Sequence, residues 1–285
     1  MRRMNNIIAF QGTPGAYSDL ACRTAYPGWQ TLPCHSFADA IEAVHEGRAT
    51  YAMLACENSL AGRVPDVHSL LPESGLHVIG EHFQRVEHCL IGIKGATIDG
   101  LKRAHSHPVA LGQIRKILKE LQLQPVVEAD TAGSAELIAK WNNPEDCAVA
   151  SSLAAELFDL DILRANVEDA AHNTTRFYVM AKSPRIPSAN TPGLMTTFVF
   201  RVRNVPAALY KALGGFATNG VNMTKLESYM IDGAFTATQF LCEVEGHPEQ
   251  PHVRRALEEL GFFSRETRIM GVYPMATQRG AGSAD

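Results

Sequence analysis

Short apolar runs alternate with amphipathic patterns over roughly the first 180 residues of the chain. IIAF leads through QGTPGAYSD to LACRTAY, YAMLAC leads through ENSLAG to VPDVHSLL, and RAHS leads through HP to VALGQIRKILKEL. PVVEA is followed by DTAGSAELIAKW, and CAVA is followed by SSLAAELFDL. Strands and helices that alternate at this length predict an α/β layer fold with largely parallel pairing.

A proline-rich stretch then interrupts the pattern. KSPRIPSANTPGL has three prolines, a glycine and no apolar periodicity, so it predicts a linker over residues 183–194. Residues 195–275 read as strand, helix, two strands, helix and strand, which is the ferredoxin-like βαββαβ order. Residues 276–285 lack an apolar pattern and are expected to be a disordered tail.

Composition narrows the classes of function. The chain is 46% hydrophobic and 20% charged, which is typical of a globular protein. A net charge of -4 with scattered lysines and arginines argues against a nucleic-acid surface, so any bound anion must be held locally. No apolar run approaches the length of a membrane span, and we expect a cytoplasmic protein with no membrane or nucleic-acid partner.

The usual signatures of cofactor and metal sites are missing from the sequence. The six cysteines show no CxxC, the eleven histidines form no ligand cluster, and neither a Walker A sequence nor HExxH occurs. We therefore expect no metal and no cofactor. No serine lies in G-x-S-x-G, which argues against covalent catalysis by a serine.

Hydroxyl, amide or glycine residues stand at the expected start of nearly every helix of the α/β half. Examples are Ser59 after Asn58, Thr131 after Asp130, and Ser151. Helix capping alone explains most such residues. In an open α/β sheet, however, these helix starts lie beyond the carboxyl ends of the strands, where their unsatisfied N–H groups can bind an anion. Both readings stay open at this point.

The segment HNTTRFYVM predicts a strand that begins with hydroxyls and a guanidinium. Alternation places Thr175 and Phe177 on one face and Arg176 and Tyr178 on the other. An ordinary strand with threonine chosen for its β-propensity is the simpler reading of these residues alone.

With GTPGAYS, ENSLAG, SHPVALGQ, DTAGSA and HNTTRF in this order, the chain resembles prephenate dehydratases over nearly its whole length. Its βαββαβ part resembles the ACT regulatory domain. No helical segment of the size of a chorismate mutase precedes residue 7, and we expect a monofunctional enzyme. The resemblance implies a two-lobed catalytic domain like a periplasmic binding protein over 5–182, with lobes 5–80 plus 172–182 and 81–171. It also implies a cofactor-free lyase that converts prephenate to phenylpyruvate in L-phenylalanine biosynthesis.

The resemblance also assigns roles to residues. Thr175 is expected to donate a hydrogen bond to the leaving hydroxyl, and Arg176 to hold a carboxylate, although strand alternation places it opposite Thr175. Asn58, Ser59 and Gly62 are expected to form an anion-binding helix start that faces Thr175. Further expected substrate contacts are Thr13, Ser106, His107, Gln113, Thr131, Ser151 and Phe177.

In the C-terminal half the chain departs from the family's pattern. GALxxxL reads AALYKAL with Ala207 in place of glycine, and ESRP reads ESYM. We still expect feedback control by L-phenylalanine, and the alternative is a dimerisation module that binds nothing. ACT domains commonly pair, so a homodimer or homotetramer is expected. The expected effector contacts are Val205, Ala207, Ala208, Leu209, Leu213, Glu227 and Ser228.

Two other functions compete with prephenate dehydratase. Arogenate dehydratase performs the same chemistry on the amino acid instead of the keto acid, and a few contacts can switch such a preference, so the sequence leaves the two open. A non-catalytic two-lobed sensor of amino acids or keto acids is a rival of another class. The intact TTRF disfavours it, because a binder has no chemical need for that hydroxyl beside an anion site.

Overall fold

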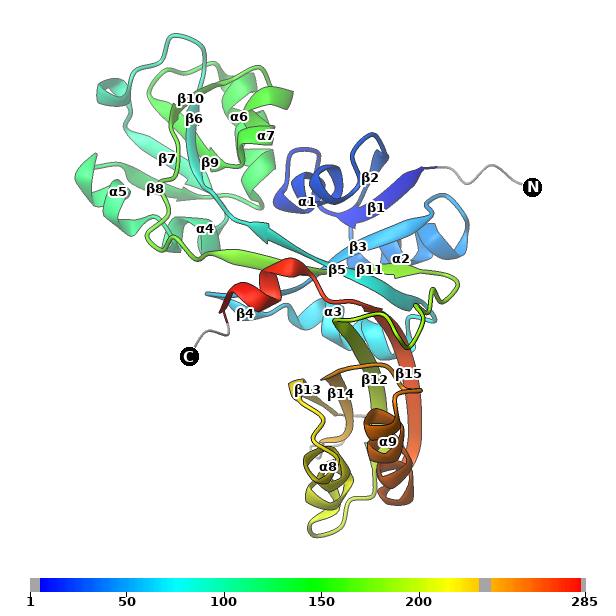
Figure 1. Cartoon of the computed structure of the whole chain (residues 1–285). Coiled ribbons are helices and arrows are strands. Elements are labelled where there is room, and N and C mark those ends of the chain that lie inside the picture. The colour runs from blue at the N-terminus through cyan, green and yellow to red at the C-terminus, as the bar shows by residue number, and fades with distance from the viewer. Residues whose placement is uncertain (1–5, 231–236, 283–285) are drawn as a thin grey trace. The chain divides into compact units, whose positions relative to one another are not determined.

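The computed structural model describes residues 6–230 and 237–282, so the predicted boundary at residue 5 lies outside the described residues (Figure 1). The chain forms two compact units. One comprises Met1–Pro65 and His82–Phe177, and the other comprises Asp66–Glu81 and Tyr178–Asp285. The second unit therefore includes residues 66–81 and 178–182, which the resemblance assigns to the two-lobed domain over 5–182.

The first sheet has the strand order β2-β1-β3-β11-β5, with β4 paired to β3. Strand β1 runs parallel to both β2 and β3. Its residues Ile8, Ala9 and Phe10 are fully buried, as expected for a central strand covered on both faces. The elements of this part of the chain are β1 (Ile7–Gln11), α1 (Tyr17–Ala25), β2 (Gln30–Cys34), α2 (Phe37–His45), β3 (Tyr51–Asn58), β4 (Gly62–Arg63), α3 (Pro65–Leu70), η1 (Leu71–Glu73), β5 (His77–Arg85) and β11 (Thr174–Ala181).

The second sheet has the order β10-β6-β9-β7-β8. Strand β7 runs parallel to β8 and β9, whereas β6 runs antiparallel to β9 and β10. Helices α6 and α7 pack against β6 and β9 through buried alanines and Ile138 (Figure 1). The elements are β6 (Cys89–Gly92), η2 (Ile98–Gly100), β7 (Arg103–Ser106), α4 (Pro108–Gly112), α5 (Arg115–Glu120), β8 (Gln124–Val127), α6 (Thr131–Trp141), β9 (Asp146–Ala150), α7 (Ser152–Leu157) and β10 (Asp161–Arg164).

The helix expected over VALGQIRKILKEL is instead two short helices, α4 and α5, with Gln113 and Ile114 between them. The Asp169 carboxylate accepts hydrogen bonds from the amides of Arg115 and Lys116, at 2.9 and 3.1 Å, and so caps the start of α5. The amide of Asp169 donates in turn to the carbonyl of Gln113 at 2.7 Å. Backbone groups that a continuous helix would hydrogen-bond to one another are thus hydrogen-bonded to Asp169, which is distant in the chain.

The C-terminal half has the predicted βαββαβ order, and its antiparallel sheet has the order β13-β14-β12-β15. Helices α8 and α9 cover one face of this sheet, around a core that contains Phe198, Phe200, Phe216 and Leu260 (Figure 1). The fold class is therefore the predicted one, an α/β part followed by a ferredoxin-like part. The elements are β12 (Leu194–Val202), α8 (Ala208–Thr218), β13 (Met223–Met230), β14 (Ala237–Glu245), α9 (Pro251–Phe263), β15 (Ser264–Pro274) and η3 (Thr277–Gly282).

The end of the chain differs from the expected disordered tail over its described part. Thr277–Gly282 form a 3₁₀ helix, and Arg279 pairs with Glu81 at 2.7 Å and with Glu243 at 2.9 Å. Both carboxylate side chains are fully buried. A segment without apolar periodicity can still be ordered when a cation in it pairs with buried carboxylates. The apolar periodicity of the sequence cannot predict such an ion pair. Residues 283–285 lie outside the described residues.

Candidate functional site

Asn58 organises the turn between β3 and β4. Its Oδ1 accepts hydrogen bonds from the amides of Leu60 at 3.0 Å and Ala61 at 2.8 Å, and Gly62 supplies a positive φ of 82°. The ENSLAG segment is therefore a hairpin turn and not the expected helix start at Asn58, Ser59 and Gly62. The prediction failed because an asparagine side chain that binds the next amides is typical of both tight turns and helix caps.

The same Asn58 side chain faces the start of β11. Its Nδ2 donates to Oγ1 of Thr175 at 3.0 Å and to Oδ1 of Asn173 at 2.9 Å. Ser59 supports this pairing, since its hydroxyl donates to the carbonyl of His172 at 2.8 Å and its amide donates to the carbonyl of Thr174 at 2.9 Å. The Thr175 oxygen thus accepts from Asn58, which leaves the hydroxyl proton to be donated to another group.

Gln113 continues this hydrogen-bonded network. Its Oε1 accepts from Nδ2 of Asn173 at 2.8 Å and from Nε2 of His88 at 2.9 Å. The other ring nitrogen of His88 lies 2.8 Å from the hydroxyl of Tyr17. Burial lowers the pKa of His88 below its ordinary value, so the imidazole is neutral at pH 7. One series of hydrogen bonds thereby links six side chains, those of Tyr17, His88, Gln113, Asn173, Asn58 and Thr175.

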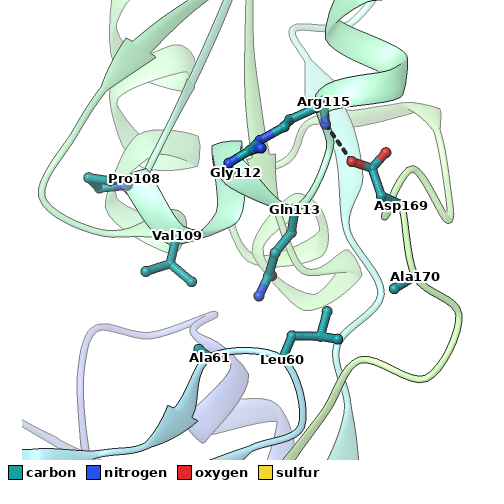
Figure 2. A pocket seen from close by; sticks show the side chains of 9 residues that line it. All are labelled: Leu60, Ala61, Pro108, Val109, Gly112, Gln113, Arg115, Asp169 and Ala170. Atoms are coloured by element: carbon teal, nitrogen blue, oxygen red, sulfur yellow. Dashed lines mark hydrogen bonds between the residues drawn. The ribbon is translucent and has the colours of Figure 1, made fainter.

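A pocket of about 480 Å³ lies beside this network (Figure 2). Gln113 lines it, and its amide end points toward Leu60 and Ala61 (Figure 2). Arg115 and Asp169 are its charged residues, but the Asp169 carboxylate already accepts from two amides. The full lining is Leu60, Ala61, Pro108, Val109, Gly112, Gln113, Arg115, Asp169 and Ala170. The sequence analysis did not predict that Arg115 and Asp169 line a pocket. Arg115 could have been found as the basic residue two positions after Gln113, which was a predicted substrate contact.

Arg176 lies on the opposite face of β11 from Thr175, as strand alternation predicts. Its guanidinium is buried, pairs with Glu57 at 2.9 Å and lies 5.9 Å from the ring centre of Phe83. Phe177 is also buried, with 1% of its surface exposed. The predicted roles of Arg176 in carboxylate binding and of Phe177 in substrate contact stay predictions.

A family model described as prephenate dehydratase matches residues 8–185. The chain belongs to the prephenate dehydratase family. A "Bifunctional N-acyl-homoserine lactone acylase/prephenate dehydratase" of Komagataeibacter europaeus is 66% identical over 273 residues, which are 96% of this chain and 97% of that protein. "Arogenate dehydratase 3, chloroplastic" of Arabidopsis thaliana is 37% identical over 96% of this chain and 68% of its own length.

Among solved structures, a prephenate dehydratase from Arthrobacter aurescens in complex with L-Phe is 27% identical with a TM-score of 0.86. The match covers 95% of this chain and 90% of that one, so it extends through the ferredoxin-like part. The fold of the described residues is therefore that of a prephenate dehydratase.

Other residues predicted for substrate contact in this family member make hydrogen bonds within the protein. Thr13 donates to the Asp130 carboxylate at 3.2 Å, and Ser151 donates to the carbonyl of Gly15 at 2.6 Å. Ser106 is fully buried and donates to a main-chain carbonyl at 2.6 Å. His107 caps α4 beside the pocket-lining Pro108, and Thr131 is the first residue of α6.

The C-terminal half of this prephenate dehydratase homologue contains a second pocket, of about 250 Å³. Of the predicted effector contacts, Val205, Ala207, Ala208 and Leu209 line it. Leu213 packs against the core instead, and Ser228 pairs across the sheet with the pocket-lining Phe240. Ala207 has a φ of 61°, a left-handed conformation that favours glycine, the residue expected there from the family pattern. Glu227 lies near Lys225 on β13, with 3.9 Å between the charged atoms.

Residues 6–230 and 237–282 contain neither a metal-binding cluster nor a membrane-spanning helix. No group of three or more histidine, cysteine, aspartate or glutamate side chains there is arranged to hold a metal ion. None of the helices in the same ranges has the length and the apolar character needed to cross a membrane.

Proposed function

We propose that this protein is a prephenate dehydratase of L-phenylalanine biosynthesis. The observation that carries the proposal is the hydrogen bond from Asn58 Nδ2 to Thr175 Oγ1, because it leaves the threonine proton available as a donor. The match to the family model over residues 8–185 supports the same reaction.

The reaction requires little of the protein beyond positioning and one donor. The bond from the ring to its carboxylate breaks and releases CO₂, its electron pair enters the ring, and the bond from the ring to the hydroxyl oxygen breaks. One proton taken up from solvent converts the departing hydroxide into water, and the aromatic ring of phenylpyruvate remains. Thr175 donates a hydrogen bond to the departing oxygen, where negative charge develops.

The substrate's carboxylates need donors in the pocket. The Arg115 guanidinium supplies positive charge, and the Gln113 amide supplies a neutral donor. Replacing Arg115 with methionine should raise KM, because it removes charge that acts on the substrate both before and in the transition state. The exposed Lys119 on α5, replaced in the same way, is the matched control.

The direct test is turnover of purified protein with prephenate and with arogenate, assayed side by side. Formation of phenylpyruvate with an equal amount of CO₂ supports the proposal. A higher kcat/KM for arogenate would instead favour arogenate dehydratase, the activity named for the Arabidopsis relative. Binding of either compound without turnover would identify a sensor.

A second activity is suggested by the Komagataeibacter relative, which is named as an N-acyl-homoserine lactone acylase as well and is 66% identical over almost the full length of both chains. We propose that this chain also cleaves the amide bond of N-acyl-homoserine lactones, with water as the co-reactant, to give a fatty acid and homoserine lactone. Detection of both products by mass spectrometry tests this activity. The Thr175→Ala variant then shows whether the two reactions share a site.

We further propose that L-phenylalanine binds the pocket at the start of α8 and lowers turnover. The Arthrobacter structure contains L-Phe, and four of the predicted contacts line this pocket. Calorimetric titration of L-phenylalanine into the full chain tests the proposal, together with Val205→Glu, which places a carboxylate in the pocket. Ile186→Glu, at an exposed position of the predicted linker, is the control. No binding and no inhibition at millimolar L-phenylalanine would reduce this half to an assembly module.

We propose a homodimer or homotetramer formed through the ACT-type half, which light scattering of the full chain tests. We place the protein in the cytoplasm, because its six cysteines are buried thiols, as expected in a reducing compartment.

A further inference from the structure

The carbonyl end of the Gln113 side chain is fully engaged by protein donors. Oε1 accepts from Nδ2 of Asn173 and from Nε2 of His88. A carboxamide whose oxygen has two donors can only present its NH₂ group to a ligand. Figure 2 shows the nitrogen of Gln113 directed into the pocket, toward Leu60 and Ala61.

His88 must be held in one orientation for this arrangement to persist. Only 2% of its surface is exposed, and its amide donates to the Glu168 carboxylate at 3.0 Å. Gln113 Oε1 can only accept, so Nε2 of His88 carries the proton and Nδ1 is an acceptor. That acceptor lies 2.8 Å from the hydroxyl of Tyr17.

Tyr17 holds His88 in this orientation through both its hydroxyl and its ring. The ring packs edge-on against His88, with 5.5 Å between the ring centres and 82° between the planes. The hydroxyl also lies 2.9 Å from the carbonyl of Glu87, a second acceptor. Burial raises the pKa of the phenol well above its usual value, so Tyr17 stays a donor. Tyr17 belongs to the GTPGAYS segment, but its side chain does not line the pocket.

We propose that Tyr17 and His88 are positioning residues, which hold the Gln113 carboxamide with its NH₂ group toward the pocket so that it binds a carboxylate of the substrate. This inference rests on the proposed dehydratase function. A substrate carboxylate is present in both the ground state and the transition state. The pair therefore acts mainly on KM, whereas Thr175 acts on kcat.

The test is steady-state kinetics on full-length variants with prephenate. Tyr17→Phe keeps the ring and removes the hydroxyl, and His88→Asn keeps an amide near Nδ1 and loses the donor at Nε2. Loss of one neutral hydrogen bond predicts that each raises KM about three- to tenfold, with kcat changed by less than about threefold. His88→Gln, whose longer side chain carries an amide donor to the Nε2 position, should restore much of the wild-type KM.

A double-mutant cycle separates positioning from a general structural role. In a Gln113→Ala background, neither Tyr17→Phe nor His88→Asn should raise KM further, because the group that they orient is gone. Tyr26→Phe, in an aromatic cluster with Trp29 and Tyr51, is the control for removal of a tyrosine hydroxyl elsewhere in the same unit. If His88→Asn does not fold, the double-mutant cycle between Tyr17→Phe and Gln113→Ala alone distinguishes positioning from a general structural role.

Three results would overturn the inference. The first is a fall in kcat at constant KM in Tyr17→Phe or His88→Asn. The second is a rise in KM on these substitutions that is as large in the Gln113→Ala background as in the wild-type protein. The third is a His88→Gln variant whose KM is as high as that of His88→Asn. These outcomes leave the dehydratase function intact. Absence of turnover of prephenate and arogenate by the wild-type protein would overturn the proposed function and this inference together.

Discussion

Asn58 and Thr175 lie 117 residues apart in the chain, and the Asn58 amide nitrogen donates to the Thr175 hydroxyl oxygen at 3.0 Å. A hydroxyl that accepts one hydrogen bond becomes a better donor for a second, because such bonds polarise one another. The amide is itself held, since its oxygen accepts from the amides of Leu60 and Ala61. The threonine proton is therefore directed away from Asn58.

Replacing Thr175 with alanine should lower kcat about 100- to 1,000-fold, because it removes a donor to charge that develops in the transition state. Thr175→Ser keeps the hydroxyl and should retain most of the activity. Thr174→Ala is the matched control, since the Thr174 side chain points to the other face of β11. Rates with prephenate, compared at equal thermal stability, check this prediction. Equal and mild effects of Thr174→Ala and Thr175→Ala would contradict it.

Asn58→Asp tests the direction of that proton. The aspartate keeps an oxygen for the amides of Leu60 and Ala61 but replaces the donor to Thr175 with an acceptor. The Thr175 proton should then point to residue 58, and kcat should fall about 100-fold or more. Asn166→Asp, at an exposed position, adds the same charge and should have little effect. Activity of Asn58→Asp close to that of wild type would refute the assigned direction.

Burial of His82 and His88 predicts a pH dependence of stability. Desolvation lowers the pKa of both side chains below the ordinary value of 6.5, so the unfolded chain binds more protons in the window just below that value. The free energy of unfolding should therefore decrease as the pH falls below 6.5, by at most about 1.4 kcal/mol per pH unit for each histidine.

Urea unfolding at a series of pH values between about 5 and 8 checks this dependence. His88→Gln should flatten the dependence of the free energy of unfolding on pH, because it removes one of the two buried imidazoles. A stability that stays constant down to the range in which carboxylates titrate would show that neither histidine is buried as a neutral group. Asp146 titrates in that lower range, since its hydrogen bonds with Arg103 lower its pKa below 3.8.

Arg279→Met should destabilise the second unit by about 3 kcal/mol, because it removes a cation that pairs with the buried carboxylates of Glu81 and Glu243. Denaturant unfolding measures the loss. Arg254→Met removes an exposed pair with Glu258 on α9 and should cost less than about 1 kcal/mol. An equally small loss for Arg279→Met would mean that the C-terminal 3₁₀ helix does not anchor the tail.

The sequence by itself determined the fold class, because alternation of apolar and polar positions is a local property of strands and helices. The runs IIAF and YAMLAC became the neighbouring strands β1 and β3, and the βαββαβ order of the C-terminal half is visible in the same periodicity. Alternation also separated Thr175 from Arg176, and the structure places Arg176 against Glu57 on the other face of β11.

Only the tertiary structure decided what each polar side chain binds. Asp169 divides the helix expected around Gln113 into two, and His88 and Asn173 turn the Gln113 amide toward the pocket. The tail became a 3₁₀ helix because Arg279 meets Glu81 and Glu243. Each of these partners lies far away in the chain, and hydrogen bonds and ion pairs depend on distances in space that no local pattern of residues encodes.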